Sequence, residues 1–176
     1  MLLTAACQSD RCRISGEARH LDDGAMVYLI TDLSTCRHAD SAIVNQGHFA
    51  LSVADGGDLA PLCQIVSAAH PEAGVTFFAV PGDVYVELRP AVGRSRVSGS
   101  KVNNQWQALN DSVALCDRRL RPLIRAIGKA DSLDCRRLYR EVRRLHTRLN
   151  DCISDAARRN RDNAMGHYIA THYTAR

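Results

Sequence analysis

The spacing of apolar residues changes near Ser100, and this change constrains the fold more than any other feature of the chain. Before Ser100, short segments alternate apolar and polar residues, which is the period-two pattern of β-strands with one buried face. After Ser100, apolar residues recur every three or four positions, as in an amphipathic α-helix. We therefore predict an α+β fold: an antiparallel β-sandwich over residues 10–99, followed by a helical segment over residues 100–176 packed on or beside the sandwich.

Turn residues divide the first part into about six to eight short strands at roughly 8–12-residue spacing, which is typical of an antiparallel sandwich. A tight turn is predicted at Asp22-Asp23-Gly24, and a hairpin is predicted in which Asp40–Val44 leads through Asn45-Gln46-Gly47 into His48–Val53, because glycine adopts the positive φ that such turns need. The strongest strand signal is Val75–Leu88, in which an apolar run meets Pro81-Gly82-Asp83 and alternation follows. We predict that this segment is a β-hairpin inside the sandwich, with a weaker edge strand near Arg94–Ser98.

Two apolar stripes predict two helices in the second part. The first stripe consists of Val102, Trp106, Leu109, Val113, Cys116, Leu120, Leu123 and Ile127. The second consists of Cys135, Leu138, Val142, Leu145, Leu149, Cys152 and Ala156. The short connection between them implies an antiparallel helical hairpin.

Local signals mark where these helices begin and end. Pro122 should kink or break the first helix near Leu120, and Gly128 should end it. Asp131 or Ser132 should cap the second helix. A third, short helix is expected from Asn163 to about Tyr173, and its inward-facing candidates are Met165, Ile169 and Tyr168.

The composition is that of an ordinary globular protein, with 45% apolar and 24% charged residues. No apolar run reaches the roughly 20 residues of a membrane-spanning helix. The sequence contains no nucleophile elbow, Walker loop, dinucleotide fingerprint or CxxC pair. We therefore predict a non-catalytic chain and assign no catalytic or cofactor-binding residue.

Positive charge is concentrated in the predicted helices. Residues 1–100 carry 7 Lys and Arg against 11 Asp and Glu, a net −4, whereas residues 101–176 carry 16 against 8, a net +8. A solvated face of a packed hairpin is the favoured interpretation, because acidic residues interleave and few aromatics are present to stack on bases. Binding of an anion or a nucleic acid is the alternative. The arginines concerned are Arg118, Arg119, Arg121, Arg125, Arg136, Arg137, Arg140, Arg143, Arg144 and Arg148.

The seven cysteines fall at positions 7, 12, 36, 63, 116, 135 and 152. Cys116, Cys135 and Cys152 lie on the apolar stripes, where core filling is the default role. The antiparallel pairing separates Cys116 from the other two by roughly 12–13 Å, beyond the roughly 7 Å that a disulfide allows, so no bridge is predicted among them. Cys12, Cys36 and Cys63 lie in the predicted sandwich, and the sequence leaves their pairing open. A Cys12–Cys36 pair is conceivable, and redox chemistry through such a pair is a further alternative function.

The seven histidines are scattered, and they do not suggest a metal site. His167 and His172 are five residues apart, so they do not share the i, i+4 face of a helical metal-binding pair. Carboxylate or thiolate partners at ligand spacing are lacking as well. We assign no metal ligand.

The segment Met1–Cys7 has two leucines, then small residues, then a cysteine. This order is typical of the end of a bacterial lipoprotein signal, in which the cysteine is the residue that is lipidated. We interpret residues 1–9 as a signal remnant or lipoprotein tether and predict Cys7 as the lipid-attachment residue. The other interpretation is an N-terminus with an incidental cysteine.

Five segments, in this order, resemble one bacterial family. They are Ile14–Leu29, Asp40–Phe49, Phe77–Val86, Val97–Asn110 and Asn160–Tyr168. Together they are similar to the domain of unknown function found near the N-terminus of thioredoxin-like thiol–disulfide oxidoreductase lipoproteins of Bacteroidetes. Each motif consists of turn and strand residues, so the resemblance depends on their order and spacing.

The resemblance implies a lipid-anchored protein of the periplasm or outer membrane, with a β-sandwich followed by helices. It implies an accessory or partner-recognition role. The partner would be a thioredoxin-like domain in cis or in trans, and the lipid anchor would bind the chain to the membrane. The family offers no catalytic residues for this module, and no nucleic-acid partner is expected.

Overall fold

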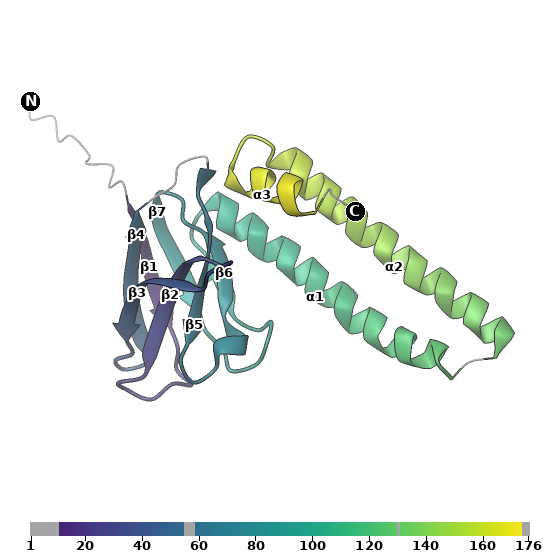
Figure 1. Cartoon of the computed structure of the whole chain (residues 1–176), viewed down its shortest axis with the longest axis horizontal. Helices are drawn as coiled ribbons and strands as arrows, with labels where there is room; N and C mark the ends of the chain where they lie inside the picture. The colour runs from purple at the N-terminus through teal and green to yellow at the C-terminus, as the bar shows by residue number, and fades with distance from the viewer. Residues whose placement is uncertain (1–10, 55–58, 130, 174–176) are drawn as a thin grey trace, which may run out of the picture. The chain divides into compact units, whose positions relative to one another are not determined.

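The computed structural model describes residues 11–54, 59–129 and 131–173. The chain forms two compact units, Met1–Asn104 and Gln105–Arg176. The first unit contains the strands, and most of the helical residues belong to the second (Figure 1).

The described part of the first unit consists of two four-stranded sheets. One sheet has the strand order β4-β1-β7-β8 and the other has β3-β2-β5-β6. The strands are β1 (Arg11–Glu17), β2 (Met26–Asp32), β3 (Arg37–Ile43), β4 (His48–Ala54), β5 (Leu62–Ser67), β6 (Val75–Phe78), β7 (Gly82–Glu87) and β8 (Arg96–Ser98). A short 3₁₀ turn, Pro71–Ala73, lies between β5 and β6.

The sandwich core forms between the two sheets because alternate side chains of each strand point inward. In β1, Cys12, Ile14 and Gly16 are buried while their neighbours are exposed. The largest buried side chains come from both sheets, so the core is shared between them. They include Ile14, Val84 and Val86 from one sheet and Val27, Leu29, Ile65, Phe77 and Phe78 from the other. The α+β class predicted from the change in periodicity is confirmed.

The prediction that Val75–Leu88 forms a hairpin is wrong. β6 pairs with β5, whereas β7 pairs with β1 and β8 in the other sheet. The chain therefore crosses from one sheet to the other at Ala79–Pro81, and β7 lies parallel to β1 rather than antiparallel. The apolar pattern indicated correctly that both strands are buried. Periodicity does not indicate, however, which other strand each of them pairs with.

Both predicted tight turns are present, and each also connects the two sheets. Gly24 has φ 90° and Gly47 has φ 74°, as the turn chemistry requires. Asn45 and His48 exchange both backbone hydrogen bonds across the second turn, at 2.9 and 3.0 Å. The hairpin predicted around Asn45-Gln46-Gly47 is nevertheless wrong, because β3 pairs with β2 in one sheet and β4 pairs with β1 in the other.

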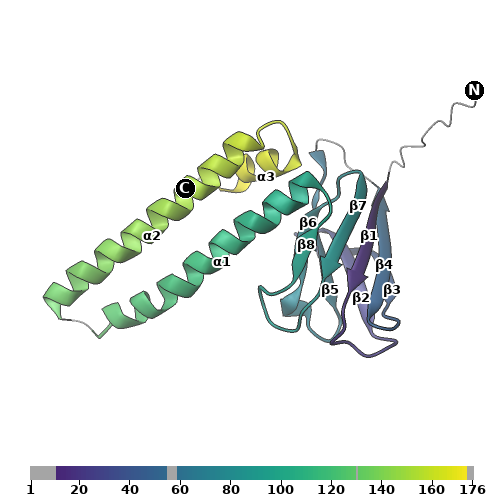
Figure 2. The same ribbon diagram turned by 180° about the vertical axis from the view of Figure 1, so that it is seen from behind.

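The helical part consists of α1 (Lys101–Ile127), α2 (Ser132–Arg159) and α3 (Ala164–His172). α1 and α2 form an antiparallel hairpin, and α3 lies at the end of α2 that is remote from the α1–α2 connection (Figure 2). Asp131 caps α2 as predicted, because its carboxylate accepts hydrogen bonds from the backbone N–H groups of Leu133 and Asp134.

Of the two outcomes predicted at Pro122, a kink or a break, the break is wrong, because α1 continues through it to Ile127. A proline removes one backbone hydrogen bond from a helix, which lowers its stability without preventing it from forming. Pro122 is on the exposed side, while Leu120, Leu123 and Ile127 keep the apolar stripe half-buried on both sides of it. Packing of that stripe against α2 therefore outweighs the lost bond.

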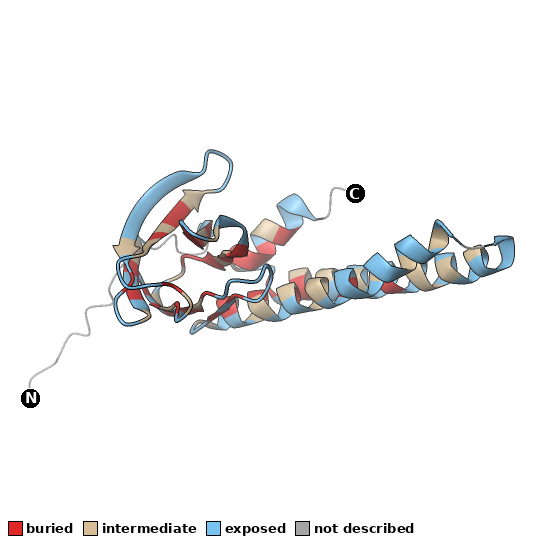
Figure 3. Cartoon of the chain, turned by 90° about the horizontal axis from the view of Figure 1, so that it is seen from below, coloured by how far each residue is buried: buried red, intermediate tan, exposed pale blue. Residues whose placement is uncertain are grey.

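Burial is uneven along the hairpin. Trp106, Leu109 and Cys116 of α1 are buried, but beyond Cys116 no described residue of this helix is. Ile124 is 58% exposed and Leu133 is 78% exposed near the connection. Figure 3 shows this end of the hairpin in pale blue and tan, with no red at the connection.

Candidate functional site

The outer face of α2 carries three arginines that we call the arginine stripe: Arg136, Arg140 and Arg143. Their spacing of four and three residues places them on one side of the helix. All three are exposed, and none of them forms an ion pair within the described residues. Tyr139, 58% exposed, lies among them, and the four side chains line one shallow hollow.

Neighbouring arginines of the same helix are paired. Arg137 lies 3.2 Å from the carboxylate of Asp134, and Arg144 lies 3.7 Å from that of Glu141. Exposed ion pairs of this kind contribute little to stability, on the order of 0–1 kcal/mol, but they do partly neutralise the charges involved. The arginine stripe is thus a group of neighbouring arginines on α2 with uncompensated positive charge. Arg148, farther along the helix, is likewise exposed and without an ion pair among the described residues.

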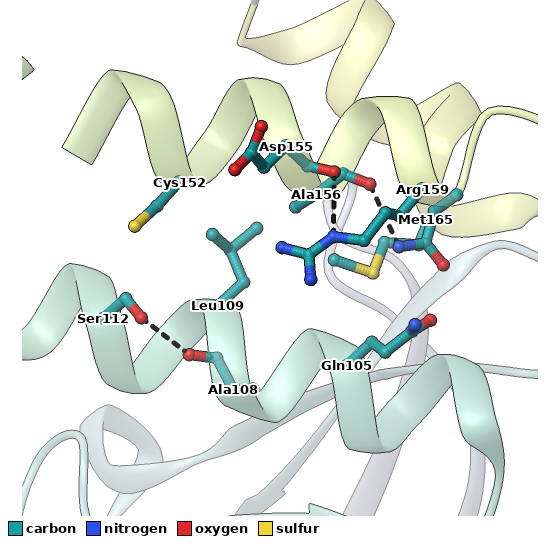
Figure 4. A pocket seen from close by; sticks show the side chains of 10 residues that line it. Gln105, Ala108, Leu109, Ser112, Cys152, Asp155, Ala156, Arg159 and Met165 are labelled. Atoms are coloured by element: carbon teal, nitrogen blue, oxygen red, sulfur yellow. Dashed lines mark hydrogen bonds between the residues drawn. The ribbon is translucent and has the colours of Figure 1, made fainter. Parts of the chain in front are cut away.

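A small cavity lies between the three helices, near the end of the hairpin where α3 begins (Figure 4). Gln105, Leu109 and Ser112 line it from α1, and Cys152 and Asp155 face it from α2. Its volume is about 180 Å³. Sites for small organic ligands usually occupy roughly 300–1,000 Å³, so this cavity is small for such a role.

The polar groups of this cavity mostly bond within their own helices. Ser112 donates to the backbone oxygen of Ala108 at 3.0 Å, and Arg159 donates to that of Asp155 at 3.2 Å. The Asp155 carboxylate pairs with Arg158. Gln105 is different, since its Oε1 is buried without a hydrogen-bond partner among the described residues. A single amide oxygen aimed into a small cavity provides no acid, base or nucleophile.

The structure separates the cysteines by burial. Cys116 is buried, with its thiol 3.8 Å from the backbone oxygen of Leu145, which agrees with a core role. Cys152 is exposed, so the interpretation of this residue as core filler is wrong. It lies at the edge of the apolar stripe, where the helices leave it open to the small cavity. Cys7 lies outside the described residues.

Cys63, rather than Cys36, is the cysteine that interacts with Cys12. Both Cys12 and Cys63 are 0% exposed, whereas Cys36 is exposed in the turn between β2 and β3. Burial, and to a smaller extent the Cys12 thiol, together raise the pKa of the Cys63 thiol to about 12. The sequence left the pairing of Cys12, Cys36 and Cys63 open, and the structure favours Cys63 as the neighbour of Cys12.

The histidines are not gathered into a site. Within the described ranges, no group of three His, Cys, Asp or Glu side chains is arranged to hold a metal ion. His20 and His70 lie 5.7 Å apart between ring centroids, and burial, then the neighbouring His70, lowers the pKa of His20. His172 stacks on Tyr168, with ring centroids 4.1 Å apart.

Asn103 is a buried polar residue with a structural role. Its amide oxygen accepts a hydrogen bond from the backbone N–H of Phe78 at 2.8 Å, and its amide nitrogen donates to the Phe78 backbone oxygen at 3.0 Å. These two bonds hold the backbone at the end of β6, where the chain leaves its sheet, and the Phe78 oxygen also accepts from the backbone N–H of Val80 at 2.8 Å. Asn103 and Phe78 belong to two of the segments that carry the family resemblance, and this contact joins the two segments.

A second pair from those segments is also explained by packing. Gly16 in β1 lies opposite Phe49 in β4, and the Phe49 ring lies directly against the glycine. A Cβ atom at Gly16 would overlap with the ring, so a larger residue there requires Phe49 to move. These motif residues build the sandwich and leave no reactive group exposed.

The remaining segment, Asn160–Tyr168, forms the junction between α2 and α3. Asn163 caps α3 by accepting hydrogen bonds from the backbone N–H groups of Met165 and Gly166, and it donates to Asn160 at 2.8 Å. Gly166 contacts the backbone of Asn160 so closely that a Cβ atom does not fit. The junction is therefore held by its own polar network.

In the described part of the chain, no helix combines the length and apolar character that crossing a membrane requires. Comparison with known proteins gave a family model, described as "Domain of unknown function (DUF4369)", that matches residues 12–106. No curated protein and no solved structure matches the chain. The matched range covers the described strands, except for Arg11 at the start of β1, and the start of α1, including Asn103. The chain therefore belongs to the DUF4369 family of domains of unknown function.

Proposed function

We propose that this chain is a non-catalytic module of the bacterial cell envelope, lipid-anchored through Cys7, that recognises a protein partner for a thioredoxin-like thiol–disulfide oxidoreductase system. The order of the family motifs supports the envelope setting. The observation that carries the recognition role is the arginine stripe, an exposed and uncompensated charged surface on a 28-residue helix.

The chemistry of this surface favours an acidic protein partner. A guanidinium group forms paired hydrogen bonds to a carboxylate and remains charged at any physiological pH. Arginine and tyrosine are also enriched at the centres of protein interfaces, where tyrosine adds apolar contact area at low entropic cost. Tyr139 between Arg136, Arg140 and Arg143 provides this combination.

The proposal can be tested by photo-crosslinking in cells that express the complete native gene. A photoreactive amino acid replaces Tyr139, and partners trapped in the envelope are identified by mass spectrometry. We expect a protein with a thioredoxin-like domain or an acidic surface, and an acylated Cys7 in the membrane fraction. The double variant Arg140→Glu/Arg143→Glu should reduce crosslinking at least about tenfold, since each close charge pair contributes on the order of 1 kcal/mol or more.

The matched control is Arg137→Glu/Arg144→Glu. It changes the net charge of the same helix by the same amount but alters the arginines that are already paired. This control should retain most of the crosslinking. Equal loss in both variants would mean that general charge, and not the arginine stripe, attracts the partner. Recovery of the chain from the cytosol without acylation would contradict the envelope setting.

Binding of a nucleic acid is the second candidate, favoured by the same arginines. Two observations argue against it: acidic residues are interleaved with the basic ones along α2, and Tyr139 is the only aromatic residue that lines the hollow of the stripe. The distinguishing measurement is the fluorescence anisotropy of a labelled DNA duplex at increasing salt. Contact of the stripe with phosphates would give a slope of log K against log salt of roughly −3, and an absence of binding at low salt would remove this candidate.

A further inference from the structure

The two fully buried cysteines of the sandwich lie on opposing sheets. Cys12 is in β1, an inner strand of the sheet β4-β1-β7-β8. Cys63 is in β5, an inner strand of the sheet β3-β2-β5-β6. In each strand the cysteine alternates with less buried neighbours, so both side chains point into the space between the sheets.

The strand register places both cysteines at the same end of the sandwich. Cys63 lies opposite Phe77 of β6, and Cys12 lies opposite Gly82 of β7. The chain passes from β6 to β7 through Ala79–Pro81, which is where it crosses from one sheet to the other. The backbone N–H of Ala79 also bonds to the oxygen of Pro61, at 3.2 Å, so the start of this crossing lies beside the start of β5.

The two thiols also interact with each other. The presence of the Cys12 thiol raises the pKa of Cys63, beyond the larger effect of burial. Two thiolates affect each other in this way only when the sulfur atoms are near one another in a poorly solvated space. Topology and electrostatics therefore agree that Cys12 and Cys63 are neighbours.

We propose that Cys12 and Cys63 form an inter-sheet disulfide that joins the two sheets of the sandwich. The bond forms by thiol–disulfide exchange with a disulfide-bearing oxidant: both thiols lose a proton, the two sulfurs join, and the oxidant is released as two thiols. A disulfide requires Cα atoms within about 7 Å, closer than the roughly 10 Å usual between packed sheets. Immunoglobulin domains meet the same requirement with a disulfide between inward-facing residues of opposing sheets.

Burial determines when the bond can form. The attacking species in exchange is the thiolate, and a thiol with a pKa of about 12 is almost entirely protonated at neutral pH. Both sulfurs are also out of reach of an oxidant in the folded state, since each residue is 0% exposed. The pair therefore oxidises while the chain folds, and the closed bond is then protected from reduction. This inference does not depend on the proposed function.

The test is oxidative refolding of the full chain. The protein is unfolded in denaturant with a reductant, then refolded either with reduced and oxidised glutathione or with reductant alone. Peptide mapping by mass spectrometry without reduction should find the Cys12 peptide joined to the Cys63 peptide, with the mass of two hydrogen atoms lost. The oxidised form should also unfold at a temperature roughly 5–10 °C higher than the reduced form.

Two variants separate this pair from the other thiols. Cys36→Ala removes the exposed cysteine and should keep both the linked peptide and the higher unfolding temperature. Cys63→Ala should lose both. Should Cys63→Ala not fold, the peptide map of the natural chain still decides. Alkylation of both Cys12 and Cys63 after oxidative refolding, or linkage of either to Cys7 or Cys36, would overturn the inference.

Discussion

At the scale of single residues, the positions that carry the family resemblance have structural roles. Asn103 is fully buried, yet it is polar, and both ends of its amide bond to the backbone of Phe78. A buried backbone group that loses its partner raises the free energy of the folded state by about 1–3 kcal/mol. Asn103 therefore stabilises the point at which the chain leaves β6 and crosses to the other sheet.

This role predicts a large difference between two adjacent residues. Asn103→Ala should lower the free energy of unfolding by about 2–4 kcal/mol, because it removes two buried hydrogen bonds to the backbone of Phe78 and leaves a small cavity. Asn104→Ala is the control, because Asn104 is exposed and its side chain accepts one hydrogen bond, from Gly99 at 3.2 Å. Its effect should stay below about 1 kcal/mol. Chemical denaturation followed by circular dichroism measures both, and equal effects would contradict the assigned role.

At the scale of elements, helix boundaries follow from local chemistry and strand pairing does not. Asp131 caps α2 with two hydrogen bonds of 3.0 and 2.9 Å, as its type and position predict. Gly128 follows the last residue of α1, also as expected. The hairpin expected at Val75–Leu88 is absent because β6 and β7 join different sheets. Turn residues determine where the chain changes direction, but they do not determine which strand a given strand pairs with.

The cap of α2 gives a prediction with a built-in comparison. Asp131→Ala should lower the stability of the helical hairpin by about 1 kcal/mol, because two backbone N–H groups of the first turn lose their acceptor. Asp131→Asn should retain most of the stability, since the amide oxygen can accept the same bonds. Thermal unfolding monitored at the helical signal measures both variants. A loss in Asp131→Asn as large as in Asp131→Ala would show that negative charge, and not hydrogen bonding, matters at this position.

At the scale of the whole molecule, burial is distributed unevenly between the sandwich and the hairpin. The inner strands have many fully buried side chains, whereas the connecting end of α1 and α2 has none among the described residues. Opening of a segment costs less free energy where few apolar contacts are broken. The connecting end of the hairpin is therefore the least stable part of the described helices, and it is also the end of α2 nearest to the arginine stripe.

Hydrogen exchange can check this distribution directly. Amides at 120–127 and 133–140 should exchange more than about tenfold faster than those of β1 and β5, because local opening there needs less free energy than unfolding of the sandwich. Amides of α1 around Trp106 and Leu109 provide the comparison within the same helix, and they should be slower than those after Leu120. Uniform protection along both helices would contradict the prediction.

The residues of the arginine stripe and of the Cys12–Cys63 pair can be read from the sequence, but their interactions cannot. The basic residues of α2 are visible in the sequence, but which of them are left without a carboxylate depends on side-chain geometry, as Arg137 and Arg140 illustrate. The seven cysteines are equally visible, yet the sequence left the pairing of Cys12, Cys36 and Cys63 open. Partners from opposing sheets become neighbours only when the sheets pack, and no local signal encodes this.

The sequence by itself determined the class of the fold, the change from strands to helices near Ser100, the turns and the caps. These depend on interactions between residues a few positions apart, which periodicity and residue type record directly. Only the tertiary structure decided that β7 lies parallel to β1, that α1 continues through Pro122, and that Cys12 faces Cys63. Each of these depends on packing between segments distant in sequence, where the energy of burying a shared core outweighs local preference.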